Sequence, residues 1–200
     1  MKQIILSLIA LWALLPVVAL AQAEPGKPAP NFSVADASGK THTLADFKGK
    51  WVVLEWFNKD CPYVKKHYGS QNMQKLQANY TAKGVQWLTV ISSKKGKQGY
   101  LEPQDALDLV KKDGIKASAI LLDTDSAMGK AFDAKVTPHM YIINPDGLIV
   151  YNGAIDDNDS SNPKVIAKSK NYVSAALDSA MAGKPVEVAS SRAYGCSVKY

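Results

Sequence analysis

The sequence predicts an α/β fold in which a mixed, largely parallel β-sheet is flanked by helices. Short apolar runs rich in branched and aromatic residues alternate with segments whose apolar residues recur at helical spacing. Such alternation is typical of parallel strands joined by crossover helices. Near the end, the turn Asn-Pro-Asp-Gly at residues 144–147 separates two apolar runs and predicts an antiparallel hairpin.

The chain is expected to enter this sheet through a small hairpin, with strands at residues 32–34 and 41–43. His42 is expected to belong to the hairpin and not to a ligand site. The first core strand spans residues 51–57 and ends at Asn-Lys-Asp, and a helix begins at Cys61. This helix is expected to be interrupted at residues 69–70 and to end at Gly84.

The remaining elements continue the alternation. We expect strands at residues 85–91 and 117–122, helices beginning near Pro103 and at Ser126, hairpin strands at 140–143 and 148–151, and a last helix from Asn162 to Gly183. In that last helix, Ile166, Val173, Leu177 and Met181 are predicted to face inward. Together these elements form one domain, residues 24–183, followed by a tail, residues 184–200, that has no clear periodicity but carries Cys196.

Residues 1–23 have the pattern of a secretory signal peptide. Lys2 precedes an apolar run over residues 4–20, and Ala-x-Ala cleavage motifs occupy residues 19–21 and 21–23. The run contains Pro16 and is shorter than the ~20 residues that span a bilayer. We therefore expect an exported bacterial protein, periplasmic or secreted, with no membrane span after cleavage. Disulfides persist in such compartments.

The net charge of +6 comes almost entirely from lysine, because Arg192 is the only arginine. Nucleic-acid readers depend on arginine forks, so we expect a solvated basic surface and no nucleic-acid partner.

Cys61 is the leading candidate for chemistry, because it directly follows a strand and opens a helix. Pro62 is tolerated in a first helical turn, where the N–H groups have no intrahelical partner. Those free N–H groups and the helix dipole favour a thiolate at Cys61. Lys65, one turn further on, is expected to stabilise the thiolate, with Lys66 and His67 beside it.

The order of elements and these motifs resemble the thioredoxin-like superfamily, in its exported redoxin or peroxiredoxin-like (AhpC/TSA) branch. That branch adds an N-terminal hairpin and an inserted helix-strand unit, and the resemblance covers about residues 28–183. It implies that Cys61 is the attacking cysteine and that Glu55, six residues earlier, is a buried acid that relays protons. It also implies that Thr137 and Pro138 form a cis-proline loop facing the cysteine. Substrate would contact Thr137, Pro62 and Tyr63.

Two departures from the family pattern restrict the chemistry. Val64 stands where thioredoxins have their second cysteine, so no Cys-x-x-Cys disulfide can form. Leu54 and Asn58 stand where peroxiredoxins have a proline and a threonine, and the core lacks an arginine. The usual donors that stabilise charge on peroxide oxygens are therefore missing.

Cys196 has two interpretations, a resolving thiol for Cys61 or one half of a permanent disulfide, and we favour the resolving role because the tail is expected to be mobile. The first functional hypothesis is a thiol-disulfide oxidoreductase acting on a protein or small-molecule disulfide, with an electron donor that the sequence does not identify. A thiol peroxidase is the second. A non-catalytic binding module with a structural disulfide is the third.

No cofactor or metal is expected. Cys61, His67 and His139 offer no close ligand pair at metal spacing. The acidic run at residues 156–159 lacks the alternating ligands of a calcium loop, so we expect a solvated turn there.

Overall fold

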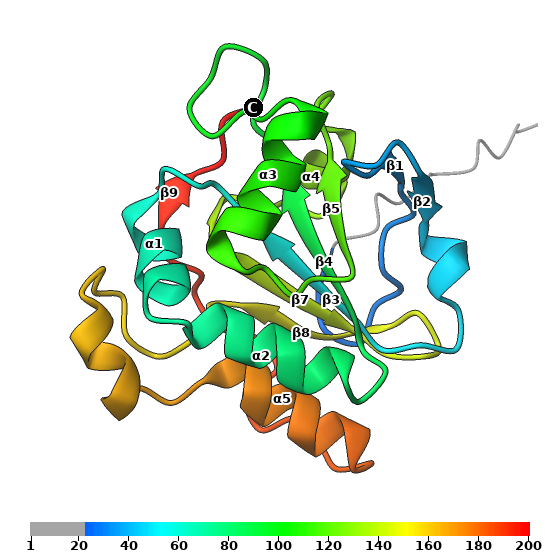
Figure 1. Ribbon diagram of the computed structural model, residues 1–200. Helices are drawn as coiled ribbons and strands as arrows, with labels where there is room; N and C mark the ends of the chain where they lie inside the picture. The colour runs from blue at the N-terminus through cyan, green and yellow to red at the C-terminus, as the bar shows by residue number, and fades with distance from the viewer. Residues whose placement is uncertain (1–22) are drawn as a thin grey trace, which may run out of the picture.

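The computed structural model describes residues 23–200 and contains a five-stranded mixed sheet in the order β5-β4-β3-β7-β8 (Figure 1). The central strand β3 (Val52–Trp56) runs parallel to β4 (Gln86–Ile91), which runs parallel to β5 (Ala119–Leu122). On its other side β3 is antiparallel to β7 (His139–Ile143), and β7 is antiparallel to β8 (Ile149–Gly153). The predicted α/β class and terminal hairpin are confirmed.

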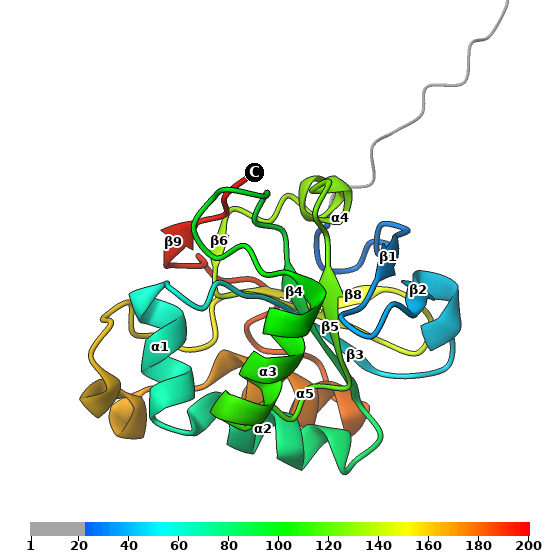
Figure 2. The same cartoon turned by 45° about the horizontal axis from the view of Figure 1, so that its top comes forward.

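Helices cover one face of the sheet and the N-terminal segment covers the other (Figures 1 and 2). Successive residues of a strand point to opposite faces, so Val53 of β3 packs on the helical side while Leu54 and Trp56 pack on the other. The helical side is formed by α1 (Pro62–Gly69), α2 (Asn72–Thr81), α3 (Pro103–Asp113) and α5 (Tyr172–Met181). The opposite side holds Phe32, Phe47 and the short helix α4 (Ala127–Ala131).

The N-terminal hairpin forms as predicted, from β1 (Ser33–Ala35) and β2 (Thr41–Thr43), and leads into the 3-10 turn η1 (Leu44–Phe47). His42 is buried in it and its Nε2 lies 2.7 Å from Asp36 Oδ2. Apart from Ala23, the predicted signal peptide lies outside the described residues. Within residues 23–200, no helix has both the length and the apolar character needed to cross a bilayer.

The helix that begins after Cys61 is broken where the sequence predicts. Gln71, directly after the Gly69-Ser70 pair, has a left-handed backbone with φ 62° and caps α2. The break lets α1 and α2 follow the sheet in different directions. Gly114 ends α3 in the left-handed conformation that glycine adopts readily.

The single last helix predicted from Asn162 is wrong. Asn162 caps only the short 3-10 helix η2 (Pro163–Lys168), and α5 has its own cap at Asn171, whose Oδ1 accepts from the Ser174 amide at 2.9 Å. Between them the Lys170 amide donates to Asp157 Oδ1 and the Lys170 carbonyl accepts from the Asp157 amide, which holds the chain extended and interrupts the helix. Ile166 is therefore not in the core, and Met181 is only partly buried.

The tail is bound to the domain along its length, which contradicts the expected mobile end. Ser190 lies beside Asn152 of the edge strand β8. The Asn152 amide donates to the Ala189 carbonyl and the Ser191 amide to the Asn152 carbonyl, each at 3.1 Å. Further on, β9 (Cys196–Ser197) pairs antiparallel with β6 (Val136–Thr137), as Figure 2 shows. The tail thus completes a separate two-stranded sheet next to the start of α1.

Candidate redox site

Cys61 lies at the N-cap of α1, as the sequence predicts. Its backbone is extended (φ −71°, ψ 125°), Pro62 occupies the first turn, and the Cys61 amide donates to the Asn58 carbonyl at 3.1 Å. The side chain is completely buried. Its thiol donates to the carbonyl oxygen of Thr137, 3.0 Å from Sγ.

The Thr137–Pro138 peptide bond is cis, and Thr137 faces Cys61, as expected from the resemblance. Pro138 stands between β6 and β7, so the loop turns directly above the end of β3. The carbonyl of Thr137 is thereby directed at the start of α1.

Cys196 lies beside Cys61 because it is the β-pairing partner of Thr137. The two cysteines are free thiols within hydrogen-bonding reach of each other. Close approach of the tail depends on Gly195, which has φ +140°. A Cβ at that position would lie 2.0 Å from the Thr137 oxygen. Glycine is thus required where the tail meets the proline loop.

The pKa values of the two thiols are shifted in opposite directions. Burial opposes ionisation of Cys61, but hydrogen bonds from the Cys196 side chain and from the backbone amides of Val64 and Cys196 outweigh it and lower the Cys61 pKa. Burial and the neighbouring Cys61 sulfur raise the pKa of Cys196 to about 11. Cys61 is therefore the more acidic of the two thiols.

Glu55 is fully buried on β3, and its carboxylate accepts from Trp87 Nε1 (2.8 Å), Tyr68 OH (2.8 Å), Gln77 Nε2 (3.2 Å) and Thr89 Oγ1 (3.4 Å). Burial outweighs these hydrogen bonds and raises the Glu55 pKa to about 6. The predicted buried acid is thus present. None of its four partners is a sulfur, so the proton relay to Cys61 stays a prediction.

The other predicted site residues differ in their positions. Pro62 is exposed and Tyr63 half-buried, with the Tyr63 ring 5.6 Å from that of Tyr194. Lys65 is exposed and lines an open hollow together with Tyr68 and Lys112. Among the described residues, the groups that lower the pKa of Cys61 do not include Lys65. The structure therefore gives no support to a thiolate-stabilising role for Lys65.

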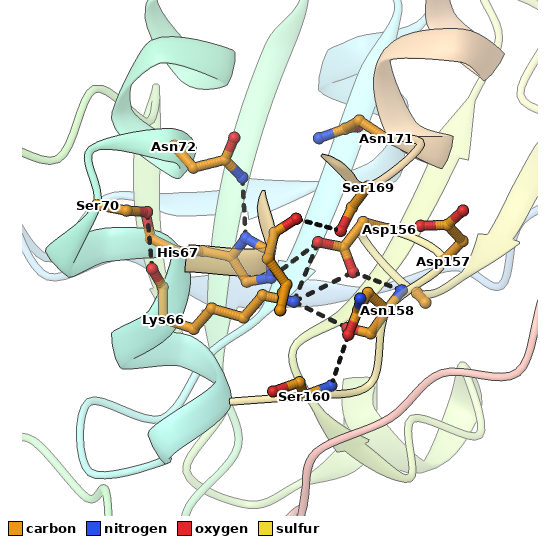
Figure 3. A network of polar contacts seen from close by, with 12 residues as sticks. Lys66, His67, Ser70, Asn72, Asp156, Asp157, Asn158, Ser160, Ser169 and Asn171 are labelled. Carbon is orange, nitrogen blue, oxygen red and sulfur yellow. Dashed lines mark hydrogen bonds and ion pairs between the residues drawn. The ribbon is translucent and has the colours of Figure 1, made fainter. Parts of the chain in front are cut away.

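Lys66 and His67 do not face Cys61 but point into a buried charged cluster (Figure 3). Lys66 Nζ lies 3.1 Å from Asp156 Oδ2 and 2.8 Å from the carbonyl oxygen of Asn158. The Nδ1 atom of His67 lies 2.8 Å from Asn72 Nδ2, within hydrogen-bond distance. The predicted solvated turn is wrong for Asp156, which is 3% exposed because Lys66 neutralises it within the fold.

No group of three or more His, Cys, Asp or Glu side chains within residues 23–200 is arranged to hold a metal ion. Burial lowers the pKa of His67 to about 4, so this ring is neutral near pH 7. With Asn72 donating to its Nδ1, its proton lies on Nε2, toward Tyr194 and Asp156.

The sequence matches the AhpC/TSA family over residues 25–152, which include β3, Cys61 and the cis-proline loop. The chain belongs to the AhpC/TSA family. A curated relative, the thiol-disulfide oxidoreductase ResA of Bacillus subtilis, is 30% identical over 126 residues, which are 62% of this chain and 64% of ResA. The match thus spans less than two thirds of ResA.

Solved structures of other proteins have the same fold as this member of the AhpC/TSA family. The crystal structure of a conserved protein from Geobacillus kaustophilus superposes with a TM-score of 0.78 and 28% identity, over 90% of this chain and 93% of that one. The thioredoxin domain of a thiol-disulfide oxidoreductase from Bacteroides vulgatus gives a TM-score of 0.51 at 20% identity, over 72% and 96%. The expected thioredoxin-like fold is confirmed.

Sequence reasoning missed Gly195, Tyr194 and Asp156. The Tyr-Gly-Cys order in the tail was the available signal for the first two, because a glycine beside a cysteine indicates a close backbone approach. Asp156 had no local signal. Its burial depends on Lys66, 90 residues earlier in the chain.

Proposed function

We propose that this protein is a thiol-disulfide oxidoreductase in which Cys61 attacks and Cys196 resolves. The observation that carries the proposal is the placement of Cys196 beside Cys61 through its pairing with Thr137. A resolving thiol must reach the attacked sulfur, and here it needs only local movement.

The reaction has two exchange steps. The Cys61 thiolate attacks one sulfur of a partner's disulfide; the partner's S–S bond breaks, a mixed disulfide forms, and the other partner sulfur leaves as a thiolate. Cys196 then loses its proton and attacks the Cys61 sulfur. The second partner sulfur leaves, the Cys61–Cys196 bond forms, and two electrons have passed from the protein to the partner.

The acidities fit this order of events. The charge and hydrogen bonding of the Cys61 sulfur are among the causes that raise the pKa of Cys196. Once Cys61 is held in a mixed disulfide its negative charge is gone, so Cys196 ionises more readily at the moment when it must attack.

We also propose that the chain is exported, with residues 1–23 containing the signal peptide. Ala23 supports cleavage at the earlier of the two motifs, after Ala21, since it is buried and its carbonyl oxygen accepts from Asn152 Nδ2 at 2.8 Å. A disulfide formed by Cys61 and Cys196 would persist in an oxidising compartment.

The proposal is tested by equilibrating the protein with glutathione at graded ratios and analysing non-reduced digests by mass spectrometry. We expect an intramolecular Cys61–Cys196 disulfide with a reduction potential above about −300 mV, the value below which structural disulfides usually lie. The Cys196→Ser variant should accumulate mixed disulfides at Cys61. Two thiols that stay free at every ratio would contradict the redox couple, and a bond that resists every ratio would identify a structural disulfide instead.

A parallel arm with hydrogen peroxide examines the peroxidase alternative. Leu54 and Asn58 replace the peroxide-stabilising residues, so we expect Cys61 to react with peroxide no faster than an ordinary thiolate of the same pKa.

A further inference from the structure

Cys61 is completely buried, although attack on a partner's disulfide requires its sulfur to be reached from outside. The tail contributes to this burial, because β9 lies on the edge of β6 and Gly195 packs against the Thr137 backbone. Figure 1 shows β9 beside the first turn of α1. The tail that supplies the second thiol therefore also obstructs the approach of a partner to the first.

Tyr194, two residues before Cys196, fixes this part of the tail to the domain. Its hydroxyl donates to Asp156 Oδ1, accepts from Lys66 Nζ at 3.3 Å and lies 3.4 Å from His67 Nε2. Its ring packs on Tyr63 of α1, and the Lys66 ammonium lies 5.3 Å from the ring centre. Burial raises the pKa of Tyr194 well above its ordinary value, so the hydroxyl keeps the proton that it donates.

The binding site for the Tyr194 hydroxyl is held together by other contacts. Lys66 bonds to both Asp156 oxygens and to the Asn158 carbonyl, and the Asn158 amide donates to Asp156 Oδ1 at 3.1 Å (Figure 3). Asp156 therefore keeps a positive partner and a backbone donor when Tyr194 is absent. Release of Tyr194 therefore leaves no uncompensated buried charge behind.

We propose that Tyr194 is a positioning residue, and that its contacts with Asp156 and Lys66 form a latch that holds residues 194–198 over Cys61. With the latch closed, Cys196 is fixed against Cys61 and external disulfides are excluded. With it open, Cys61 is accessible to a partner. The role of the latch in catalysis rests on the proposed function, whereas the latch itself can be tested in the reduced protein.

The latch predicts opposite effects on the two exchange steps. Weakening it exposes Cys61 and accelerates the first attack on an external disulfide. The same change lowers the local concentration of Cys196 at the mixed disulfide and slows resolution. General destabilisation of the fold would not by itself accelerate the first attack and slow the resolution.

The test compares Tyr194→Phe and Tyr194→Ala with Tyr172→Phe, a matched control that removes a tyrosine hydroxyl lining the same hollow as Asp156. In a Cys196→Ser background, Cys61 is the only thiol, and its alkylation by iodoacetamide is followed against pH. The plateau rate at high pH reports access, because the thiolate is then fully formed. Circular dichroism checks that each variant is folded.

We expect Tyr194→Phe to raise the plateau rate about tenfold, which corresponds to the loss of one hydrogen bond to a charged group. Tyr194→Ala should raise it further and Tyr172→Phe should leave it unchanged. In proteins that retain Cys196, single-turnover reduction of a disulfide peptide should show faster attack and slower resolution in both Tyr194 variants.

A plateau rate that is unchanged in both Tyr194 variants overturns the latch, even if Cys61 and Cys196 form a disulfide. Conversely, failure of the unmodified protein to form that disulfide overturns the proposed function, while the alkylation rates still decide the latch. The two failures are therefore distinguishable.

Discussion

The carbonyl oxygen of Thr137 accepts the Cys61 proton only while the sulfur is neutral. The amides of Val64 and Cys196 and the Cys196 thiol favour the ionised sulfur instead. Cys61 thus has hydrogen-bond partners in both protonation states, which allows a buried thiol to ionise without leaving an unsatisfied group. The N-terminus of α1 contributes to this through the Val64 amide, as the sequence predicts for a helix start.

Glu55 gives a residue-scale prediction about pH. Its pKa is about 6 in the folded protein, because burial outweighs its hydrogen bonds, against about 4.5 when it is unperturbed. Its contribution to stability is therefore fully present below pH 4.5 and is lost as the pH rises through 6. The pKa difference corresponds to about 2 kcal/mol.

Replacing Glu55 by Gln keeps the volume and removes this titration. We expect the free energy of unfolding of Glu55→Gln, relative to the unmodified protein, to rise by about 2 kcal/mol between pH 4.5 and pH 7. Urea unfolding at the two pH values measures it. An equal difference at both values would show that Glu55 ionises in the fold as it does in the unfolded chain.

At the scale of elements, the β6–β9 pairing depends on Gly195. Alanine there would place a Cβ 2.0 Å from the Thr137 oxygen at φ +140°, so the tail must separate from the proline loop. We expect Gly195→Ala to lower the free energy of unfolding by about 1–3 kcal/mol and to expose Cys61 to alkylation.

The control for this prediction is Gly183→Ala. Gly183 also has a positive φ, +69°, but a Cβ there meets no atom within 4 Å. The Gly183→Ala variant therefore measures the effect of backbone strain alone, without a steric clash of the added Cβ. Cys61 alkylation that is equally slow in both variants would show that β9 tolerates the side chain and does not depend on glycine.

Elements whose signals are local could be predicted from the sequence. Cys61-Pro62 after an apolar strand marks the start of α1, and Asn-Pro-Asp-Gly marks the β7–β8 hairpin, because helix starts and tight turns depend on neighbouring residues. The break before α2 followed from Gly69-Ser70. Glu55 and the cis-proline loop followed from the family resemblance.

Features that depend on distant partners could not be predicted in this way. Asp156 is in an acidic run that reads as solvated, and only its pairing with Lys66 on α1 explains its burial. The tail has no periodicity, because its contacts are backbone pairings to β8 and β6 and a few scattered side-chain anchors, among them Ser191, Tyr194 and Tyr200. Such pairings leave no regular hydrophobic pattern in a sequence.

At the scale of the whole molecule, the two cysteines lie at the start of α1 and in the last strand, so a bond between them would close residues 61–196 into one loop. Cross-linking residues so far apart in sequence removes conformational entropy from the unfolded chain. Because the reduced protein already holds Cys196 beside Cys61, forming the bond requires little rearrangement of the folded state.

We therefore expect the oxidised protein to be more stable than the reduced protein by up to roughly 4–5 kcal/mol in the free energy of unfolding. Guanidinium unfolding of both forms, followed by tryptophan fluorescence, measures the difference. The Cys196→Ser variant should unfold at the same denaturant concentration with and without reductant. Equal stability of the two forms of the unmodified protein would mean that strain from the bond in the folded state cancels its entropic effect on the unfolded chain. The contact between the two thiols in the reduced protein would then not have the geometry that a disulfide requires.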